Sequence, residues 1–552
     1  MAGQNGMVAA AHPLAADAGA AVLKQGGNAI DAAVASAFVV GVVEPMMSGI
    51  GGGGSMTVWL EEQNQAEYLN FYARAGSDPD YERDGLRNAD VSKERWVAIP
   101  GAVDGLLKAH ERFGRLPLAV VMEPAIRIAE EGFHVHPMLA RIIADYKSVL
   151  THDSTSAALF YPDDAPLQAG DLLVQQTLAE TLKRILIHGR DGYYAGPVAQ
   201  EIIRKLSKGD NPITLDELAG YDSQWLRPQC STYNGYTVLT APPPLGGTEV
   251  LLALELLEPY DLPAMGTPDS SSRALATYID AFRIAQTDRI AYMGDPDAAA
   301  VPAVGLTSEA YAKERSIYMG NPAPARLPEG NPWDEEQMAL PKACQLIDPF
   351  GSTTLEYPPA DLEVTKEEES GGHTTHLSVI DKHGNAVSLT YTMGLYFGSG
   401  VYAGGAFLNS AANLFNSRPA NRRGPHRTPR STTAPTIVLE GDNVRLAVGA
   451  AGAGRIGPAI VEMITYILDY GIPPEQAISM PRMYPFSDTV EVRIEDGFTG
   501  NALTTLRNMN YNLNIYPKQD IYFGGVHLVY LTKDGTLVGA ADPRRNGKAS
   551  GY

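Results

Sequence analysis

Two runs of alternating apolar and polar residues, 374–381 and 386–392, constrain the fold of this chain more than any other feature. Strict alternation is typical of a half-buried β-strand. The short turn between the runs contains Gly384 and Asn385, which suit tight turns. The pattern therefore predicts a β-hairpin that begins at Thr374.

The segment that leads into this hairpin, residues 363–372, is acidic and ends in Ser-Gly-Gly. A solvated tether that passes directly into a threonine-led core strand indicates chain cleavage between His373 and Thr374. Cleavage would give Thr374 a free α-amine beside its own hydroxyl, which pairs a nucleophile with a built-in base. Threonine is also common in strands because its branched Cβ suits the pleat, so the pattern by itself leaves both interpretations open.

The chain has 552 residues, of which 44% are hydrophobic and 19% charged, as in a globular protein with more than one small core. Its net charge of −21 argues against a nucleic-acid-binding surface, because phosphate binding requires clustered cations. An acidic balance of this kind more often serves solubility than the choice of a partner.

Neither the cysteines nor the histidines form a metal-binding pattern. The two cysteines, Cys230 and Cys344, are too few for a disulfide framework and lack the Cys-x-x-Cys spacing of zinc sites. His373 and His376 flank the two threonines, and a strand would direct them to opposite faces. We expect no metal and no cofactor.

The N-terminus, residues 1–9, has neither the basic start nor the apolar centre of a signal peptide. The longest apolar run, residues 35–43, is far shorter than a membrane span. The chain as given is therefore expected to be cytoplasmic with no membrane contact, or periplasmic or secreted if a signal was removed from it.

The rest of the sequence predicts a mixture of helices and strands, with antiparallel hairpins near the C-terminus and no internal repeat. Residues 319–372 show weak periodicity and many Pro, Glu, Asp and Ser residues, so little regular structure is expected there. Helices are expected within 12–43, 101–147, 174–207, 248–257, 271–293 and 458–468, and strands within 55–60, 236–240, 444–448 and 522–538.

Two glycine motifs, 49–54 and 452–457, match the G-x-G-x-x-G fingerprint of dinucleotide-binding folds. The first is followed by a strand where that fold requires a helix, and the second lacks a strand after its helix, so neither predicts NAD binding. A glycine-rich turn at a helix N-terminus also presents free N–H groups to an oxyanion. The second loop therefore fits an acyl-transfer site at least as well as a phosphate site.

Further motifs are spread along almost the whole chain and connect these observations. They are Gly6-Met-Val-Ala, Gly26-Gly-Asn-Ala-Ile-Asp-Ala-Ala, Val43-Glu-Pro-Met-Met-Ser-Gly-Ile-Gly-Gly-Gly, Ile99-Pro-Gly-Ala-Val-Asp-Gly, Pro242-Pro-Pro-Leu-Gly-Gly, Asp288-Arg-Ile-Ala-Tyr-Met-Gly-Asp-Pro and, most specific, Thr374-Thr-His-Leu-Ser-Val-Ile-Asp. In this order they resemble the γ-glutamyltransferase family of N-terminal-nucleophile hydrolases.

The resemblance implies an αββα sandwich, an α+β fold in which two antiparallel sheets lie between helical layers. It also implies self-cleavage at His373–Thr374 into a large subunit, residues 1–373, and a small subunit, residues 374–552. The two subunits would interleave as one structural unit, and a homo-oligomer is left open.

The same resemblance implies the roles of the catalytic residues. Thr374 Oγ1 would attack an amide carbonyl while the α-amine of Thr374 accepts the proton. Thr392 matches the threonine that hydrogen-bonds the nucleophile's amine, whereas Thr375 would point to the other face. Gly452 and Ala453 match the backbone pair of the oxyanion hole, where alanine is harmless if only its N–H is used.

Several positions depart from the family pattern for binding a γ-glutamyl group. The arginine that holds the α-carboxylate is replaced by Tyr72, and the nearest arginine is Arg74. Ala411 and Leu414 stand where polar or acidic residues hold the α-amine, and Asn413 is the nearby polar substitute. A carboxylate or an ammonium buried without its partner is strongly disfavoured, so we expect an acyl group other than γ-glutamyl.

Other differences lie close to this pocket in the motifs. The family's asparagine after the second catalytic threonine is replaced by Gly394, and its serine pair by Ser431 and Thr432, which keep both hydroxyls. Segment 416–430 is short and basic, as if the family's lid loop were trimmed. Its arginines either bind an anionic acyl group or pair with the acidic surface of the large subunit, and both interpretations remain open. These arginines are Arg418, Arg422, Arg423, Arg427 and Arg430.

The sequence thus predicts a self-processing threonine amidohydrolase. It would form an acyl-Thr374 ester from a small-molecule amide and pass the acyl group to water or to an amine. Family members with altered pockets resemble oxamate-type amidases or glutaryl-cephalosporin acylases, so a small dicarboxylate half-amide is a candidate substrate. Two alternatives remain: a glutathione hydrolase or γ-glutamyltransferase with a rebuilt pocket, and a catalytically silent scaffold that never self-cleaves.

Overall fold

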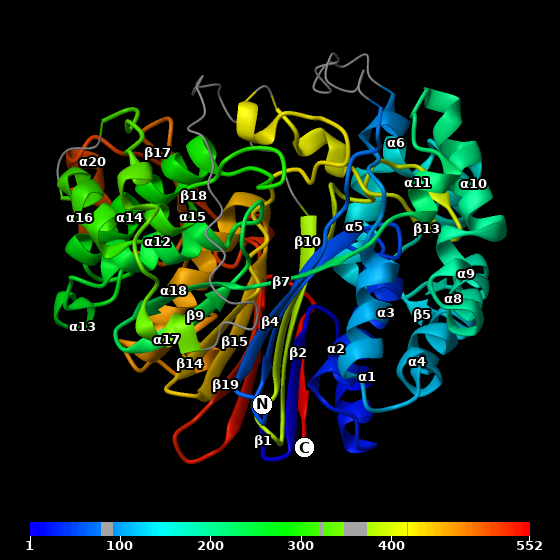
Figure 1. The fold of residues 1–552 in the computed structure, drawn as a ribbon, viewed down its shortest axis with the longest axis horizontal. Helices are drawn as coiled ribbons and strands as arrows, with labels where there is room; N and C mark the ends of the chain where they lie inside the picture. Colours follow the sequence, from blue (N-terminus) through cyan, green and yellow to red (C-terminus); the bar gives the residue numbers. More distant parts are fainter. Residues whose placement is uncertain (79–91, 321–323, 347–372, 417) are drawn as a thin grey trace.

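A computed structural model describes residues 1–78, 92–320, 324–346, 373–416 and 418–552 of the chain. Within these residues two seven-stranded sheets pack face to face, and helices cover the outer face of each sheet (Figure 1). These four layers confirm the αββα sandwich that the sequence resemblance implied. The two termini lie side by side, and the N–H of Gln4 donates to the carbonyl of Tyr552.

The second sheet has the predicted hairpin at its centre, and all its strand pairs are antiparallel. Its strands in spatial order are β21 (Lys548–Gly551), β2 (Gly6–Ala10), β10 (His373–Asp381), β11 (Ala386–Gly394), β3 (Gly53–Leu60), β4 (Gln65–Phe71) and β7 (Gln224–Leu226). The predicted hairpin is therefore confirmed, and both strands that flank it, β2 and β3, come from the first 60 residues of the chain.

The first sheet is also antiparallel throughout and combines C-terminal strands with strands from the middle of the chain. Its strands in spatial order are β1 (Ala2–Gly3), β20 (Leu537–Ala541), β19 (Gly525–Leu531), β15 (Asn443–Ala451), β14 (Thr436–Glu440), β9 (Tyr236–Thr240) and β8 (Gln229–Tyr233). The smaller sheets consist of β5 (Phe133–His134) with β6 (Leu172–Leu173), β12 (Tyr402–Ala403) with β13 (Ala406–Phe407), and β16 (Met483–Pro485) with β17 (Glu491–Glu495) and β18 (Asn512–Tyr516).

Helices from the first part of the chain lie on the side of the second sheet, and most later helices lie on the side of the first sheet (Figure 1). The earlier helices are α1 (Pro13–Lys24), α2 (Ala29–Val43), α3 (Ala102–Phe113), α4 (Leu118–Glu131), α5 (Pro137–Asp145), α6 (Lys147–Leu150), α7 (Ser154–Phe160), α8 (Gln176–His188), α9 (Asp191–Tyr194), α10 (Gly196–Leu206) and α11 (Leu215–Ala219). The later helices are α12 (Gly247–Leu257), α13 (Leu262–Met265), α14 (Ser272–Tyr292), α15 (Ala303–Leu306), α16 (Glu309–Arg315), α17 (Lys342–Leu346), α18 (Ile456–Leu468), α19 (Pro474–Ala477) and α20 (Gly500–Asn508).

Three hydrophobic cores correspond to the three interfaces between the four layers. One core joins α1 and α2 to the second sheet, and another joins α12, α14 and α18 to the first sheet. The third lies between the two sheets and contains Met7, Trp59, Ile380, Ile437 and Val529. Because α2 is buried on all sides, it is apolar around its whole circumference rather than along one stripe.

The hairpin turn is held by a single carboxylate. Asp381 accepts hydrogen bonds from the N–H groups of His383 and Asn385, while Gly384 adopts a φ of 87° that other residues avoid. Asp381 also accepts from the N–H of Ala29 at 3.0 Å, at the N-terminus of α2. The turn therefore fixes the hairpin against the helical layer.

Cys230 of β8 and Cys344 of α17 form a disulfide across 114 residues. The sequence provided too few cysteines to predict a disulfide framework, and this single bridge instead joins the edge of the first sheet to a short helix. Both residues are at least 95% buried and belong to the core between the sheets.

The helices predicted from periodicity are confirmed, with glycines at the predicted ends of α3 and α4. The predicted strands are confirmed as parts of β3, β9, β15, β19 and β20. Strands β2, β4, β8 and β14 carry no comparable signal in the sequence. Residues 347–372, including the acidic tether before the hairpin, lie outside the described residues.

Candidate active site

The predicted nucleophile and its threonine partner meet at the start of the central hairpin. Thr374 Oγ1 donates a hydrogen bond of 3.1 Å to Thr392 Oγ1, and each residue is only 4% exposed. The β10–β11 register shifts between His373 and Thr374, because His373 pairs with Gly394 and Thr374 pairs with Thr392. Such bulges redirect backbone and side chains next to active sites. Here the irregularity coincides with the bond that is predicted to break.

Thr392 also contacts that bond. Its hydroxyl donates to the His373 carbonyl oxygen at 2.9 Å and accepts from the Gly394 N–H at 2.9 Å. Together these contacts form a relay from the Thr374 hydroxyl, through Thr392, to the His373 carbonyl. The sequence resemblance assigned Thr392 to the α-amine of Thr374. In the uncut chain that nitrogen is still an amide, and the Thr392 hydroxyl reaches the carbonyl instead.

Gly394 stands where the family has asparagine, and its surroundings leave no room for a side chain. Its φ of 89° favours glycine, and a Cβ at this position would lie 2.5 Å from Ser410 Oγ. The Ser410 hydroxyl accepts from the Leu395 N–H at 3.0 Å and donates to the Met393 carbonyl at 3.2 Å. The serine therefore occupies the space next to the nucleophile's partner strand.

The two residues after the nucleophile belong to the structural core. Thr375 Oγ1 donates to Glu44 Oε2 at 3.0 Å, which confirms that it faces away from Thr392. His376 is buried between the sheets, where its ring nitrogens share hydrogen bonds with Thr390 and Ser378. Burial holds the pKa of His376 well below its ordinary value. This histidine therefore serves packing and not metal binding.

His373, on the other side of the scissile bond, stacks face to face on Tyr396. The ring centroids are 3.2 Å apart and the planes are inclined by 9°. Burial, then Arg545 and Arg455, hold the pKa of His373 well below its ordinary value. Burial raises the pKa of Tyr396, the charges of Arg545, Arg141 and Arg455 act to lower it, and Glu44 acts to raise it. Both arginines that act on His373 therefore also act on the tyrosine stacked against it.

The predicted oxyanion loop follows β15 and precedes α18. Gly452 has a φ of 134° and Ala453 a φ of 52°. The sequence indicated that alanine is harmless here if only its N–H is used, and that use stays a prediction. The left-handed backbone at Ala453 does carry a cost, because alanine in this conformation is strained by about 1 kcal/mol relative to glycine. The adjoining residue Ala451 pairs with Gly525 of β19, so the loop is anchored to the first sheet.

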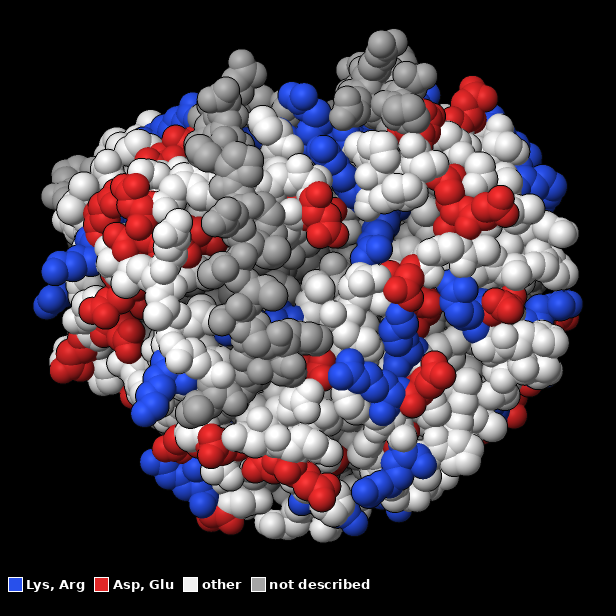
Figure 2. Space-filling model, viewed as in Figure 1, with Lys and Arg blue, Asp and Glu red and all other residues white. Residues whose placement is uncertain are grey.

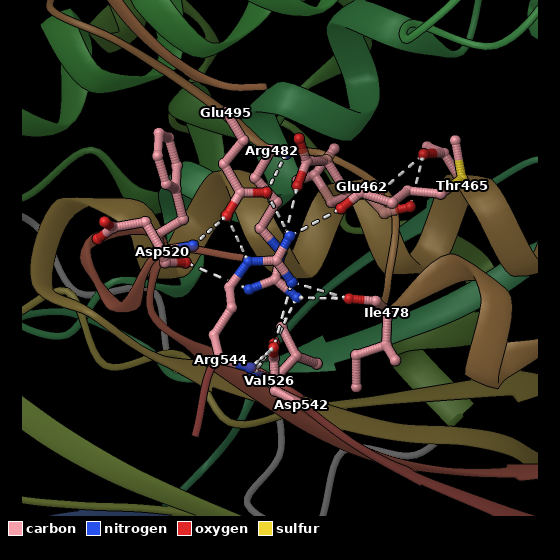
Figure 3. Close-up of polar contacts among 12 residues, drawn as sticks. Glu462, Thr465, Ile478, Arg482, Glu495, Asp520, Val526, Asp542 and Arg544 are labelled. Atoms are coloured by element: carbon pink, nitrogen blue, oxygen red, sulfur yellow. Dashed lines mark hydrogen bonds and ion pairs between the residues drawn. The ribbon is translucent and has the colours of Figure 1, made fainter. Parts of the chain in front are cut away.

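A buried network of charged residues supports the far side of this loop (Figure 3). Arg482 Nη2 donates to Asp542 Oδ2 at 2.6 Å and its Nη1 to the Phe523 carbonyl at 3.2 Å. Arg544 binds both Glu495 and Asp542, with an Nε–Oε1 distance of 2.7 Å to Glu495. Phe523 precedes Gly524, whose Cα would contact a Cβ placed at Gly452. The network therefore positions the chain on which the predicted oxyanion loop rests.

The positions that depart from the γ-glutamyl pattern come together in space. Tyr72 and Ala411 are buried members of one apolar cluster, and Leu414 packs against it. Tyr72 is 2% exposed, and a hydrogen bond to Ser431 acts to lower its pKa, although burial raises it to about 12. A neutral ring and aliphatic groups therefore lie together at the positions where the sequence resemblance implied an arginine and polar amine partners.

The remaining predicted pocket residues differ in how well the structure supports them. Asn413 has a buried Oδ1 with no hydrogen-bond partner among the described residues, as a ligand-facing amide would. Arg74 lies over the ring of Tyr221 at 5.7 Å, and its charge acts on Asp295. The carbonyl of Thr432 lies against Gly246. Their contacts with substrate stay predictions.

The arginines of the basic segment contribute mainly to structure. Arg418 and Arg430 are buried, and each donates through Nη1 to the Ile290 carbonyl, at 2.7 and 2.8 Å. Arg423 donates to the Arg95 carbonyl at 3.4 Å. These contacts support pairing with the large-subunit region, through backbone carbonyls. Figure 2 shows basic side chains along the middle of this face, with acidic ones spread to the left, the right and the lower edge. Anion binding by Arg422 and Arg427 stays a prediction.

Within the described ranges, no group of three or more His, Cys, Asp or Glu side chains is arranged to hold a metal ion. None of the helices in the same ranges combines the length and the apolar character needed to cross a bilayer.

Comparison with known proteins places the chain in a family. The family model described as Gamma-glutamyltranspeptidase matches residues 15–552. The chain belongs to this family. The glutathione hydrolase proenzyme of Bacillus subtilis (strain 168) is 34% identical to it over 100% of this chain and 92% of the relative. The acylase ACY 1 proenzyme of Pseudomonas sp. (strain SE83) is 32% identical over 99% and 93% of the two chains.

Solved structures agree with this assignment. The cephalosporin acylase from Bacillus halodurans superposes with a TM-score of 0.86 and 26% sequence identity, covering 100% of this chain and 96% of that chain. The γ-glutamyltranspeptidase family member described here is therefore an enzyme of the amidohydrolase and acyltransferase class, with a glutathione-hydrolase-like or acylase-like function. The boundary at residues 373 and 374 and the roles of individual residues stay predictions.

Proposed function

We propose that this enzyme is a self-processing threonine amidohydrolase whose substrate acyl group lacks the amino-acid end of a γ-glutamyl group. The main support is the apolar cluster that contains Tyr72 and Ala411 and contacts Leu414. These residues replace the groups that would neutralise an α-carboxylate and an α-ammonium. The contacts of Thr374 and Thr392 support the self-processing step.

In the first reaction the chain cuts itself. Thr374 Oγ1 attacks the His373 carbonyl carbon and gives its proton to the Thr392 hydroxyl, which gives its own proton to the carbonyl oxygen as negative charge develops there. The tetrahedral hydroxyl formed in this way then gives a proton to the nitrogen of Thr374 as the C–N bond breaks, and His373 remains as an ester on Thr374 Oγ1. Water hydrolyses this ester into a His373 carboxylate and a Thr374 that carries both a hydroxyl and a free α-amine. The products are residues 1–373 and 374–552.

In the second reaction the mature site cleaves its substrate. The α-amine of Thr374 accepts the proton of Oγ1 as this oxygen attacks the amide carbonyl. The N–H groups of Gly452 and Ala453 stabilise the oxyanion, and the amine product leaves with the proton held by the α-ammonium. Water then hydrolyses the acyl ester on Thr374, or an amine takes the acyl group.

The acyl preference follows from the cost of burying charge. A buried charged or polar group without a partner costs about 1–3 kcal/mol or more, which corresponds to a factor of roughly 10 to 100 in kcat/KM. A γ-glutamyl group would bring two such groups against Tyr72, Ala411 and Leu414. The acylase relative supports this interpretation, and the 34% identity to a glutathione hydrolase supports the alternative that the pocket was rebuilt around the same substrate.

A gel and a matched substrate series test the proposal. Wild type should give two bands on a denaturing gel, and Thr374→Ala a single one. Four p-nitroanilides then separate the two charges: γ-glutamyl, glutaryl without the amine, 4-aminobutyryl without the carboxylate, and butyryl without either. We expect butyryl to exceed γ-glutamyl by about tenfold or more in kcat/KM. If γ-glutamyl is the fastest of the four, the rebuilt glutathione hydrolase is correct. A wild-type chain that stays intact favours the silent scaffold.

The disulfide also bears on location. Cystine bridges persist mainly in oxidising compartments. The Cys230–Cys344 bridge therefore supports the second predicted location, periplasmic or secreted, over the cytoplasm. Alkylation of free thiols in protein isolated from its native cells, followed by mass measurement, tests this assignment, and two modified cysteines would refute it.

A further inference from the structure

Arg545 is a buried arginine close to the nucleophile. It is 8% exposed, and its Nη1 contacts Met47 Sδ at 3.1 Å. Across the described parts of the chain its Nε has no hydrogen-bond partner, and its guanidinium forms no ion pair. A buried guanidinium with a donor left unpaired is costly, and such a group in a native protein calls for an explanation.

The contacts of Arg545 with β19 direct its side chain toward the predicted active site. Its neighbour Arg544 is held by Glu495 and Asp542 (Figure 3), whereas the Nη1 of Arg545 contacts Met47. The stem of Arg545 crosses β19 at Gly525, where any Cβ would collide with Arg545 Cγ. Gly525 pairs with Ala451, directly before the predicted oxyanion loop. The guanidinium therefore passes beside the end of the strand that carries this loop.

A flat aromatic surface lies in the same region. Tyr396 is covered by the His373 ring at 3.2 Å and is flanked edge-on by Tyr146 at 5.0 Å. Arg545 acts electrostatically on both His373 and Tyr396. A buried carboxylate, Glu44, also lies in this region: burial raises its pKa, the charge of Arg545 acts to lower it, and its Oε2 accepts from Thr375 Oγ1. The region thus combines an aromatic face with a buried arginine and a carboxyl group whose charge burial disfavours, and the His373 ring of the uncut chain covers the aromatic face.

We propose that, after cleavage, Tyr396 and Arg545 bind a planar, negatively charged group of the substrate, of the aryl carboxylate class, where His373 lies in the uncut chain. The inference rests on the self-cleavage proposed above, which turns His373 into a chain end that can leave. An aromatic ring stacked on Tyr396 contributes about 0.5–1.5 kcal/mol. A carboxylate suits the planar donor fork of an arginine and neutralises its charge. The group belongs either to the acyl half or to the amine half of the amide.

Competitive inhibition of the processed wild-type enzyme tests the site directly. Benzoate and benzamide share a planar ring and differ in charge, and both are assayed against hydrolysis of butyryl p-nitroanilide. We expect benzoate to bind at least tenfold more tightly than benzamide. Arg545→Met, which keeps the stem, should bring the two inhibitors within twofold of each other. Tyr396→Leu should weaken both by about three- to tenfold. Arg127→Met, on the exposed face of α4, is the matched control and should leave both constants unchanged.

The uncut chain provides a second measurement. In Thr374→Ala the His373 ring stays on Tyr396, so benzoate should bind at least tenfold more weakly than to the processed enzyme, as measured by calorimetry. Equal binding of benzoate and benzamide to the processed wild type overturns the proposal, as does a benzoate preference that persists in Arg545→Met. If Arg545→Met does not mature, the proposal is judged on two other measurements: the ratio of the benzoate and benzamide inhibition constants in wild type, and the weakening of both inhibitors in Tyr396→Leu.

Two substrate pairs identify which half of the amide carries the anion. Isophthaloyl and benzoyl p-nitroanilides differ by a carboxylate on the acyl half, whereas butyryl 3-carboxy-4-nitroanilide and butyryl 4-nitroanilide differ by one on the amine half. In one pair we expect at least a tenfold preference in kcat/KM for the substrate with the carboxylate, and loss of this preference in Arg545→Met. That pair identifies the half of the amide that carries the anion. A preference in neither pair refutes the proposal. If the enzyme matures and hydrolyses anilides without such a preference, only the anion site is refuted and the amidohydrolase function stands. If the chain stays uncut or inactive, the amidohydrolase function itself is contradicted.

Discussion

Thr392→Val isolates the hydroxyl that connects the nucleophile to the scissile bond. Valine keeps the branched shape of threonine but removes three contacts: with Thr374 Oγ1 at 3.1 Å, with the His373 carbonyl at 2.9 Å and with the Gly394 N–H at 2.9 Å. The first two act on the chemistry of self-cleavage, and the third acts on stability. The substitution therefore has two separate consequences that can be measured apart.

The kinetic consequence follows from loss of the donor to the carbonyl oxygen. Removing one donor from a developing oxyanion typically raises the barrier by about 2.7–4 kcal/mol, so self-cleavage should slow by roughly 10²- to 10³-fold. The assay is a time course on denaturing gels that follows the full-length chain and its two products. Thr392→Ser keeps the hydroxyl and should cleave within about tenfold of wild type. Cleavage of Thr392→Val within threefold of wild type would refute the relay.

The stability consequence follows from the Gly394 N–H, which would stay buried without an acceptor. Such a group costs about 1–3 kcal/mol. Urea unfolding is measured in the Thr374→Ala background, so that both chains remain uncut. Equal unfolding free energies for Thr374→Ala and Thr374→Ala/Thr392→Val would show that the glycine amide finds another partner.

Three further predictions concern the disulfide, the oxyanion loop and a buried carboxylate. Cys344→Ser removes a cross-link between residues 114 apart and should lower the free energy of unfolding by about 2–4 kcal/mol; urea unfolding with and without reductant checks this, and wild type unaffected by reductant would contradict it. Ala453→Gly should keep kcat within twofold and change stability by less than about 1 kcal/mol, since relief of left-handed strain is offset by the chain entropy of glycine; a tenfold loss of kcat would show that more than the N–H is used. Burial raises the pKa of Glu462 to about 8, although Arg482 and Arg544 act to lower it. The folded state therefore holds this proton more tightly than the unfolded chain, and the resulting stability is full below about pH 4.3 and is lost as pH rises through about 8. Glu462→Gln should flatten this decline in urea unfolding at pH 5, 7 and 9, and parallel declines in both proteins would refute the assignment.

Features that depend on neighbouring residues could be predicted from the sequence. The hairpin follows from alternation over two short runs and from turn residues between them, and α18 follows from its apolar period. The position of Thr374 at the start of a strand comes from the same local pattern. These signals are readable because strand and helix periodicities act over a few residues.

Strand β2, which lies between β21 and β10, could not be predicted from local pattern. Its five residues, Gly6–Ala10, are buried and carry no alternation, because strands covered on both faces lose the polar phase. Its neighbours β10 and β21 come from the other half of the chain. Nothing in a five-residue apolar run specifies partners that far away.

The site divides in the same way. Residue types in the sequence predicted the nucleophile and the altered pocket. The arginine of the family pattern, for example, is replaced by Tyr72. That Tyr72 and Ala411, far apart in the chain, share one apolar cluster is a property of the packed layers. So is the stacking of His373 on Tyr396, because face-to-face contact depends on where the bulge directs each ring.

The sequence by itself therefore determined the central hairpin, most of the helices, the family likeness and the threonine at which chemistry is expected, because these depend on short-range pattern and residue type. Only the tertiary structure decided which distant groups share an environment: the bridge between Cys230 and Cys344, and the packing that lets the charge of Arg545 act on Tyr396. The physical reason is that burial and charge are set by all four layers together. A guanidinium can bind an anion strongly only where packing has removed its water and left its donors without partners.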